Sequence, residues 1–158
     1  MEIRFAKPED TTGLLALLRQ IGELHHAGRP DIFQKNAQKF SASALLDMLS
    51  DPDAPIFVAV EGENVLGYCI CKVMRFKNHP VVTDHSIFFI DDLCVDAACR
   101  GQKIGTLLME KAKEYARWLK CDLLTLNVWA FNEDAMKFYE AMGLKPQKIG
   151  MELRLEEG

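Results

Sequence analysis

The 158-residue sequence lacks an apolar run of the roughly 20 residues that a membrane-spanning helix needs. Its N-terminus, MEIRFAKPED, lacks the apolar core of a signal peptide. An excess of positive charge is also missing: the net charge is −4, whereas a nucleic-acid-binding protein gains much of its affinity from a basic surface. We therefore expect a cytoplasmic protein that binds neither membranes nor nucleic acids.

Cysteine patterns typical of metal or disulfide sites are absent as well. The five cysteines, at positions 69, 71, 94, 99 and 121, contain no CxxC pair, and their odd number does not suit a disulfide framework. We expect small buried side chains in a reducing compartment, and no metal site. The length and the hydrophobic fraction of 49% are typical of a single globular domain, which we place at residues 1–158.

Hydrophobic periodicity predicts the order of the helices and strands. Helices are expected over about 11–26, 43–49, 104–120 and 132–142, with a loop over 74–85. Strands are expected over 1–6, 56–60, 65–73, 86–95, 123–128 and 149–155. Strands mixed with helices in this order predict the α/β fold class with one mixed sheet.

The stretch CRGQKIGTLLMEKA, residues 99–112, joins an apolar strand to the helix with the clearest apolar periodicity. Gly101 and Gly105 leave backbone N–H groups uncovered where the helix begins and its dipole is positive. Arg100 and Lys103 add full charges. The stretch therefore indicates a site for an anion such as diphosphate, although an ordinary strand-to-helix turn with solvated basic residues has the same pattern. It has neither the GKS/T ending of a P-loop nor the glycine spacing of a dinucleotide fold.

This stretch and the segment NEDAMKFYEAMGL, which follows about 30 residues later, resemble the GCN5-related N-acetyltransferase (GNAT) family. Residues 100–105 are similar to the family's cofactor loop, R/Q-x-x-G-x-G/A, except that Lys103 replaces the first motif glycine. We expect a right-handed helical backbone at Lys103, which a residue other than glycine adopts without strain. The second family block, N-x-x-A-x-x-F-Y, is matched by Asn132, Ala135, Phe138 and Tyr139.

The resemblance implies a single-domain fold with a mostly antiparallel sheet, helices on both faces, and a splay between the fourth and fifth strands. It implies acetyl-CoA as the cofactor, with pantetheine in the wedge that the splay opens. A backbone N–H near Cys94 or Val95 would polarise the thioester carbonyl. The implied cofactor-binding residues are Leu93, Cys94, Val95, Arg100, Gly101, Gln102, Lys103, Ile104, Gly105, Thr106, Asn132, Ala135, Phe138 and Tyr139.

Three residues are implied to carry the chemistry. Asp91 is the first candidate for the base that deprotonates the amine, directly or through a water, and Tyr139 is the candidate acid for the departing thiolate. In a regular strand Asp92 would face the opposite side from Asp91, although a bulge would change this. The alternatives are that the acidic pair only binds a cationic substrate or pairs with a Lys or Arg, and that Tyr139 only packs beside Phe138.

Other polar and aromatic residues are weaker candidates for the acceptor site, and each is at least as compatible with a surface or core position. They are His25, Asp31, Phe33, His85, Asn127 and Trp129. Asn127 stands in an apolar strand, where a buried amide needs hydrogen-bond partners.

The leading functional hypothesis is direct transfer of acetyl from acetyl-CoA to a primary amine in a ternary complex. The acidic balance favours a polyamine or another small cationic amine; a peptide or protein amino group or an aminoglycoside is the alternative. A covalent route through Cys94 or Cys99 is disfavoured because no histidine lies nearby in sequence. A non-catalytic acyl-CoA sensor is the alternative from another class. The resemblance also implies a homodimer.

Overall fold

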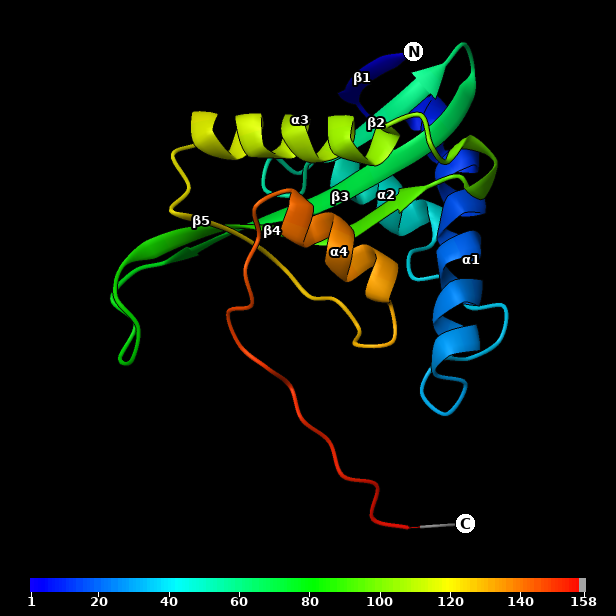
Figure 1. Cartoon of the computed structure of the whole chain (residues 1–158). Coiled ribbons are helices and arrows are strands. Elements are labelled where there is room, and N and C mark those ends of the chain that lie inside the picture. The colour runs from blue at the N-terminus through cyan, green and yellow to red at the C-terminus, as the bar shows by residue number, and fades with distance from the viewer. Residues whose placement is uncertain (157–158) are drawn as a thin grey trace. The chain divides into compact units, whose positions relative to one another are not determined.

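The computed structural model describes residues 1–156 and divides into two compact units, Met1–Asn127 and a second that begins at Val128. Figure 1 labels the elements. The first unit contains β1 (Glu2–Phe5), a 3₁₀ turn (Pro8–Asp10), α1 (Thr11–Gly28), α2 (Ala42–Leu49), β2 (Ile56–Glu61), β3 (Asn64–Phe76), β4 (His85–Val95), a second 3₁₀ turn (Ala97–Cys99), α3 (Ile104–Trp118) and β5 (Leu123–Leu126). The second unit contains α4 (Glu133–Ala141).

The first unit is built on one five-stranded sheet in the order β1-β2-β3-β4-β5. Neighbouring strands are antiparallel except for the parallel pair of β4 and β5. The helices α1 and α2 lie on one face of the sheet and α3 on the other (Figure 1). The expectation of a mixed, mostly antiparallel sheet with helices on both faces is therefore confirmed.

The core is divided by the sheet into two layers. On the α1 face, Leu14 and Leu18 pack with Val58 and Tyr68, all of them fully buried. On the α3 face, the ring centroid of Tyr115 lies 5.5 Å from that of Phe57 and 6.1 Å from that of Phe88. Because both faces are covered, β2 and β3 appear in the sequence as nearly continuous apolar runs.

Strand β4 changes its pairing at its middle. Ile70 of β3 lies opposite Asp92, whereas the next residue, Cys71, lies opposite Ile90. Asp91 is therefore the extra residue of a β-bulge. On the other side, β5 pairs with β4 only over residues 87–90, so that β4 runs on to Val95 without β5 beside it. The expected splay between the fourth and fifth strands is confirmed, and it begins at the bulge.

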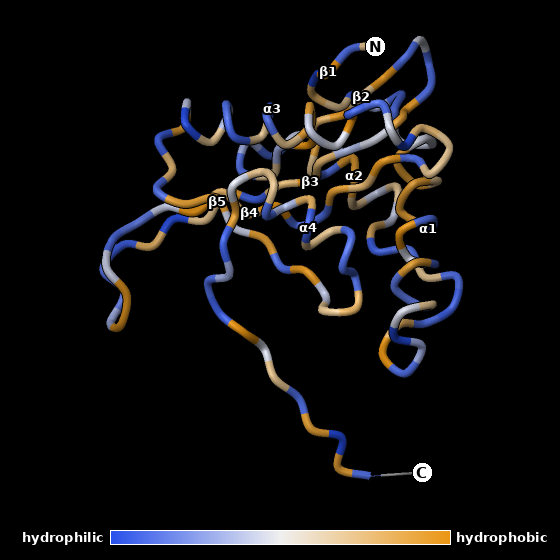
Figure 2. Tube along the Cα trace, in the orientation of Figure 1, coloured by the Kyte–Doolittle hydropathy of each residue, from blue (hydrophilic) through white to orange (hydrophobic). Residues whose placement is uncertain are grey.

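Two expectations about strands are wrong. Residues 74–76 and His85 belong to β3 and β4, which form a longer hairpin than expected because the pairing continues to Phe76 opposite His85. Residues 149–155 form no strand in the described structure. Their alternation is clear (Figure 2), but a strand requires hydrogen bonds to a neighbouring strand, and within residues 1–156 none pairs with them.

The second unit owes its helix to local signals. The side chain of Asn132 caps α4 by accepting a hydrogen bond from the backbone N–H of Ala135 at 3.3 Å. Gly143 ends the helix with a φ of +96°, which glycine adopts without strain, as the sequence predicts. Among residues 1–156, no helix in either unit has the length and apolar character needed to cross a membrane.

Candidate active site

The bulge of β4 presents two carboxylates next to each other. Asp91 is the extra residue of the bulge, and its side chain is 31% exposed. The Nζ of Lys39 lies 2.9 Å from Oδ1 of Asp91 and 3.3 Å from its backbone oxygen. Lys39 belongs to the loop between α1 and α2, so this ion pair ties that loop to the bulge.

Asp92 is more enclosed and has a different partner. The hydroxyl of Tyr68, a buried residue of β3, donates a 2.9 Å hydrogen bond to Oδ2 of Asp92. Burial raises the pKa of Asp92, and the charge of Asp91 adds to the effect; the hydrogen bond from Tyr68 and the charge of Lys39 oppose it. A carboxylate with a raised pKa is a better proton acceptor near neutral pH.

The expectation that the two carboxylates face opposite sides holds only for a regular strand. The bulge interrupts the alternation, and the charge of Lys39 acts on both groups, by direct contact with Asp91 and at longer range on Asp92. The pair therefore forms one anionic site. This arrangement suits the binding of an ammonium group and the removal of its proton.

Two residues of this site were not anticipated from the sequence. Tyr68 stands in an apolar strand, and a buried phenol needs a hydrogen-bond partner. Its position in the sequence could therefore have indicated a polar contact at this point of the sheet. Burial and the charge of Asp92 raise the pKa of Tyr68, which keeps the phenol protonated as the donor. Lys39 lies in a loop without periodicity, and nothing in the sequence indicates that it reaches Asp91.

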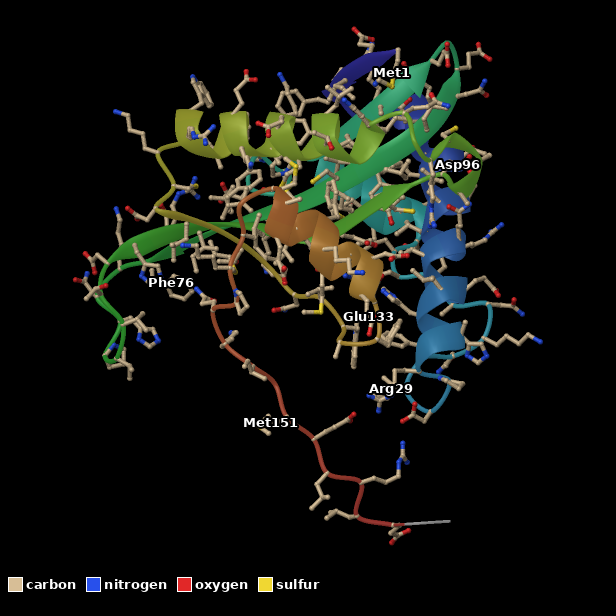
Figure 3. The ribbon with its side chains drawn as sticks, viewed as in Figure 1. Met1, Arg29, Phe76, Asp96, Glu133 and Met151 are labelled. Carbon is tan, nitrogen blue, oxygen red and sulfur yellow. The ribbon has the colours of Figure 1, made fainter. Side chains whose placement is uncertain are left out.

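The glycine-containing loop follows directly after β4. Asp96, labelled in Figure 3, begins the 3₁₀ turn by accepting a hydrogen bond from the N–H of Ala98 at 3.0 Å. The first helical bond of α3 runs from the N–H of Leu107 to the oxygen of Lys103 at 3.1 Å, so the N–H groups of residues 104–106 lie in the open first turn. Residues 100–103 are exposed. Such a turn is suited to an anion.

The backbone of this loop corrects one expectation. Lys103 has a φ of +61° and ψ of +23°, which is the left-handed region, not the right-handed helical one. Gly101 is also left-handed, with a φ of +86°. The next residue, Ile104, is 1% exposed and anchors the start of α3 in the core. The turn therefore keeps the conformation that glycine favours even though lysine adopts it at a cost.

Cys94 belongs to the core and not to the anionic site. Its side chain is 5% exposed, and its sulfur lies 3.8 Å from the backbone oxygen of Leu17 in α1. Burial, helped by the charge of Asp92, raises the pKa of the Cys94 thiol to about 12. A thiol with this pKa holds almost no thiolate at neutral pH, which argues against a covalent route through Cys94.

Two candidates for the acceptor site lie on the same side as Lys39. The rings of His25 and Phe33 are stacked with centroids 4.9 Å apart, at the end of α1 and in the loop that follows. Burial lowers the pKa of His25, and the charge of Lys39 lowers it further. His25 is therefore near the ammonium that contacts Asp91. Asp31 forms a 2.8 Å ion pair with Arg29, which Figure 3 labels near the end of α1.

Two other candidates lie near opposite ends of the part of β4 that pairs with β5. His85 is stacked on Phe76 at the start of β4, six residues before Asp91, which corresponds to roughly 20 Å along an extended strand. Asn127 is exposed, so the expectation of a buried amide is wrong. It follows Leu126, which pairs with Ile90, and therefore lies beside the bulge at the end of β5. The strand ends earlier than its apolar pattern suggests because its pairing with β4 stops at Leu126.

The remaining candidates belong to the second unit. Tyr139 is half-buried in α4, and its ring lies 5.4 Å from that of Phe138 at an angle of 63°. Trp129 is 38% exposed and stacks on Phe131 with centroids 6.3 Å apart. The cap of α4 uses Asn132, so the sequence block matched to the family also has a local structural role.

Comparisons with known proteins agree on one family. A model of the acetyltransferase (GNAT) family matches residues 18–144. The chain is 32% identical over 146 residues to aminoalkylphosphonate N-acetyltransferase from Salmonella typhimurium, a match that covers 91% of this chain and 84% of that protein. It is 28% identical over 151 residues to thialysine N-epsilon-acetyltransferase from Bos taurus, covering 89% and 82%. A solved structure of a mutant BH1408 protein from Bacillus halodurans superposes with a TM-score of 0.94 and 30% identity, covering 99% of this chain and 100% of that one.

Proposed function

Because the chain belongs to the GNAT family of acetyltransferases and is an acetyl-CoA-dependent N-acetyltransferase, we propose that its acceptor is a small cationic amine, such as a polyamine. This proposal rests on the anionic site at the β4 bulge, where Oδ1 of Asp91 lies 2.9 Å from the ammonium nitrogen of Lys39. The family match spans both units, which supports one acetyltransferase domain over residues 1–158.

The donor is expected to lie along the second half of β4. Within residues 1–156, residues 92–95 pair with β3 on one side and with no strand on the other, where a pantetheine arm would form hydrogen bonds much as an added strand does. The diphosphate would lie on the turn formed by residues 100–106, where the N–H groups of the open first turn of α3, Arg100 and Lys103 supply positive charge. Asn132, Ala135 and Phe138 complete the cofactor site in this proposal.

The proposed reaction begins with the removal of a proton from the acceptor. An alkyl ammonium with a pKa near 10 must lose a proton before it attacks, and Asp91, accessible on the bulge, accepts that proton directly or through a water. The N–H of Cys94 or Val95 stabilises the oxyanion of the tetrahedral intermediate. Tyr139 then donates a proton to the thiolate of coenzyme A. Asp92 keeps a second negative charge beside the ammonium, and Tyr68 holds its carboxylate in place.

The acceptor would reach Asp91 from the side of α1. His25 and Phe33 form a stacked pair there, and the lowered pKa of His25 keeps this ring neutral, so that it does not repel a cationic substrate. Asp31 and Trp129 remain weaker candidates for contacts with the rest of the acceptor.

The proposal is tested by acetyl-CoA turnover with a panel of amines. The panel contains polyamines, an aminoalkylphosphonate, thialysine, an aminoglycoside and a lysine peptide, and both coenzyme A release and the acetylated product are measured. We expect the highest kcat/KM with a polyamine or another small cationic amine. A preference for the peptide or the aminoglycoside would contradict the proposed acceptor class. Binding of acetyl-CoA without turnover of any amine would indicate a sensor.

The role of Tyr139 is tested by the Tyr139→Phe variant. Loss of the proton donor should lower kcat by about 10²-fold or more, because general acid catalysis contributes roughly 10²–10⁴-fold. Acetyl-CoA binding should be retained, since phenylalanine keeps the ring that packs beside Phe138. Unchanged turnover of a good amine substrate would show that Tyr139 only packs.

The proposal includes a homodimer assembled through the last segment of the chain. Ile149, Met151, Leu153 and Leu155 are 80–91% exposed and alternate with Gly150, Glu152, Arg154 and Glu156. An alternating segment with an uncovered apolar face is suited to pair as a strand with a second copy. The occupant we propose is therefore another molecule of this chain.

The assembly is tested by sedimentation of the wild type and of a Met151→Asp, Leu153→Asp variant. The wild type should sediment as a dimer and the double variant as a monomer, because two charges on the apolar face oppose its burial. A matched change on the polar side, Glu152→Ser, should leave the dimer intact. A monomeric wild type, or a dimer that survives both charges, would contradict this assembly.

A further inference from the structure

The ammonium that contacts Asp91 belongs to the chain itself. Lys39 ends in a primary amine, the same chemical group that the proposed reaction acetylates. Its Nζ lies 2.9 Å from Oδ1 of Asp91, the proposed base, and 3.3 Å from the backbone oxygen of the same residue. Lys39 therefore holds an internal amine at the position proposed for the nitrogen of the acceptor.

Lys39 is held there weakly enough to move. Its side chain is 46% exposed and that of Asp91 is 31% exposed, and an ion pair between exposed groups typically contributes about 0–1 kcal/mol. The additional contact of Lys39 is with the ring of Phe40, with Nζ 5.5 Å from the centroid. Four methylene groups allow the amine to shift without a change in the backbone of the loop.

From this geometry we infer that Lys39 is itself an acetyl acceptor, modified by its own chain when acetyl-CoA is bound and no other amine is present. The inference rests on the proposed function, because it uses the same base and the same thioester. It adds a modification site in the loop between α1 and α2 that the proposed function does not contain.

The proposed step uses acetyl-CoA, solvent and the side chains of Lys39, Asp91 and Tyr139. The ammonium of Lys39 gives a proton to Asp91, which passes it to solvent. The free amine attacks the carbonyl carbon of the thioester, so that an N–C bond forms and the C–S bond breaks. The attacking nitrogen releases its second proton to solvent as the amide forms, and the leaving thiolate takes a proton from Tyr139, which solvent restores. Lysine ammonium and acetyl-CoA thus become acetyl-lysine, coenzyme A thiol and one released proton.

Acetylation would change the charge of the site. An acetylated Lys39 is neutral, so it no longer pairs with Asp91, and the cation that acts on both Asp92 and His25 is lost. The modification therefore removes the internal competitor for the carboxylates, and the KM for a cationic acceptor should fall.

The test is incubation of the full chain with isotopically labelled acetyl-CoA and no acceptor, followed by peptide mass spectrometry over time. Lys35 is the internal control, because it is an exposed lysine of the same loop. Lys39 should be labelled about tenfold faster than Lys35 or more, because an aligned base contributes roughly 10²–10⁴-fold. The rate per molecule should not depend on protein concentration, as expected for a reaction within one chain.

Three variants separate enzymatic labelling from chemical acetylation by acetyl-CoA. Asp91→Asn and Tyr139→Phe should bring the labelling rate of Lys39 down to that of Lys35. Lys39→Arg keeps a positive charge opposite Asp91 but offers no acetylatable amine, and it should show no fast labelling at any site. Circular dichroism confirms that each variant is folded before it is compared.

The possible results separate a failure of the Lys39 inference from a failure of the proposed function. Fast labelling of Lys39 that depends on Asp91 supports the inference. Labelling of Lys39 no faster than that of Lys35, by enzyme that acetylates an amine of the panel in parallel, overturns the inference and leaves the proposed function standing. If no amine is acetylated, Lys39 included, the proposed function itself is overturned.

Discussion

The two halves of β4 differ in their strand pairing and in the side chains that they carry, although they are continuous in sequence. Residues 86–90 are flanked by β3 and, from residue 87, also by β5, and they include the buried Phe88 and Ile90. Among the described strands, β3 is the one that lies beside residues 91–95, which carry both carboxylates. One extra residue, Asp91, marks the change. The first half supports the sheet, and the second half offers a free edge and charge.

The difference shows how a strand can serve both stability and chemistry. An unpaired backbone edge and two adjacent carboxylates would weaken the centre of a sheet. Here they are placed where β5 has already ended, with Lys39 and Tyr68 as partners for the two acids. The following four predictions test this division, from the largest expected effect to the smallest.

A change in the first half should damage stability and leave the chemistry intact. Phe88 is fully buried, with its ring 6.1 Å from that of Tyr115. Phe88→Ala should lower the free energy of unfolding by about 3–5 kcal/mol, the usual cost of removing a buried aromatic ring. Urea denaturation measures the loss. If kcat per folded molecule also fell strongly at low temperature, the two halves would not be separable.

A change at the bulge should lower the activity and leave the free energy of unfolding nearly unchanged. Asp91→Asn should lower kcat/KM for the amine by about 10²-fold, because an amide cannot accept the proton. The free energy of unfolding should change by less than about 1 kcal/mol, since the lost ion pair with Lys39 is exposed. Asp84→Asn, an exposed carboxylate before β4, is the matched control. Equal activities of the two variants would remove Asp91 from the mechanism.

The burial of Asp92 should make the stability of the fold depend on pH. Burial raises its pKa in the folded state, so the charged form destabilises the fold, and stability falls as the pH rises from the ordinary carboxyl range through the folded pKa. Asp92→Asn should therefore raise Tm by about 2–4 °C at pH 7, the scale of 1 kcal/mol for this size. The gain should vanish below about pH 4. A gain that persists unchanged in acid would point to another cause.

The smallest effect is expected at the turn after β4. Lys103→Gly should change the Kd for acetyl-CoA by no more than about fivefold, because an exposed charge contributes about 1 kcal/mol or less. Glycine relieves the left-handed backbone at this position, which offsets its greater freedom in the unfolded chain. Isothermal titration calorimetry measures the Kd. A loss of binding by orders of magnitude would show that Lys103 itself holds the diphosphate.

Local sequence patterns were sufficient for most of the fold. The apolar stripe of α3, the cap at Asn132 and the glycine at 143 each act within a few residues, and the elements lie close to their expected bounds. The segment of residues 149–155, which forms no strand in the described structure, could not be judged in this way. Its alternation is genuine, but whether a segment becomes a strand depends on a partner that the segment does not contain.

The candidate site was predictable only where its residues share one motif. Asp91 and Asp92 stand together in a strand, so their proximity followed from the sequence, but the bulge that changes their facing depends on register with β3. Lys39 reaches Asp91 across 52 positions of sequence, which no spacing rule describes. His85 belongs to the same strand as Asp91 but stands six residues before it, at the first position of β4.

The most direct test is amide hydrogen exchange along β4 with and without coenzyme A. If the second half of the strand is the free edge that takes the cofactor arm, exchange at residues 92–95 should slow when coenzyme A binds, while residues 87–90, already paired on both sides, should not change. Saturating coenzyme A that leaves residues 92–95 unchanged, or that protects only residues 87–90, would contradict the division of β4 at Asp91.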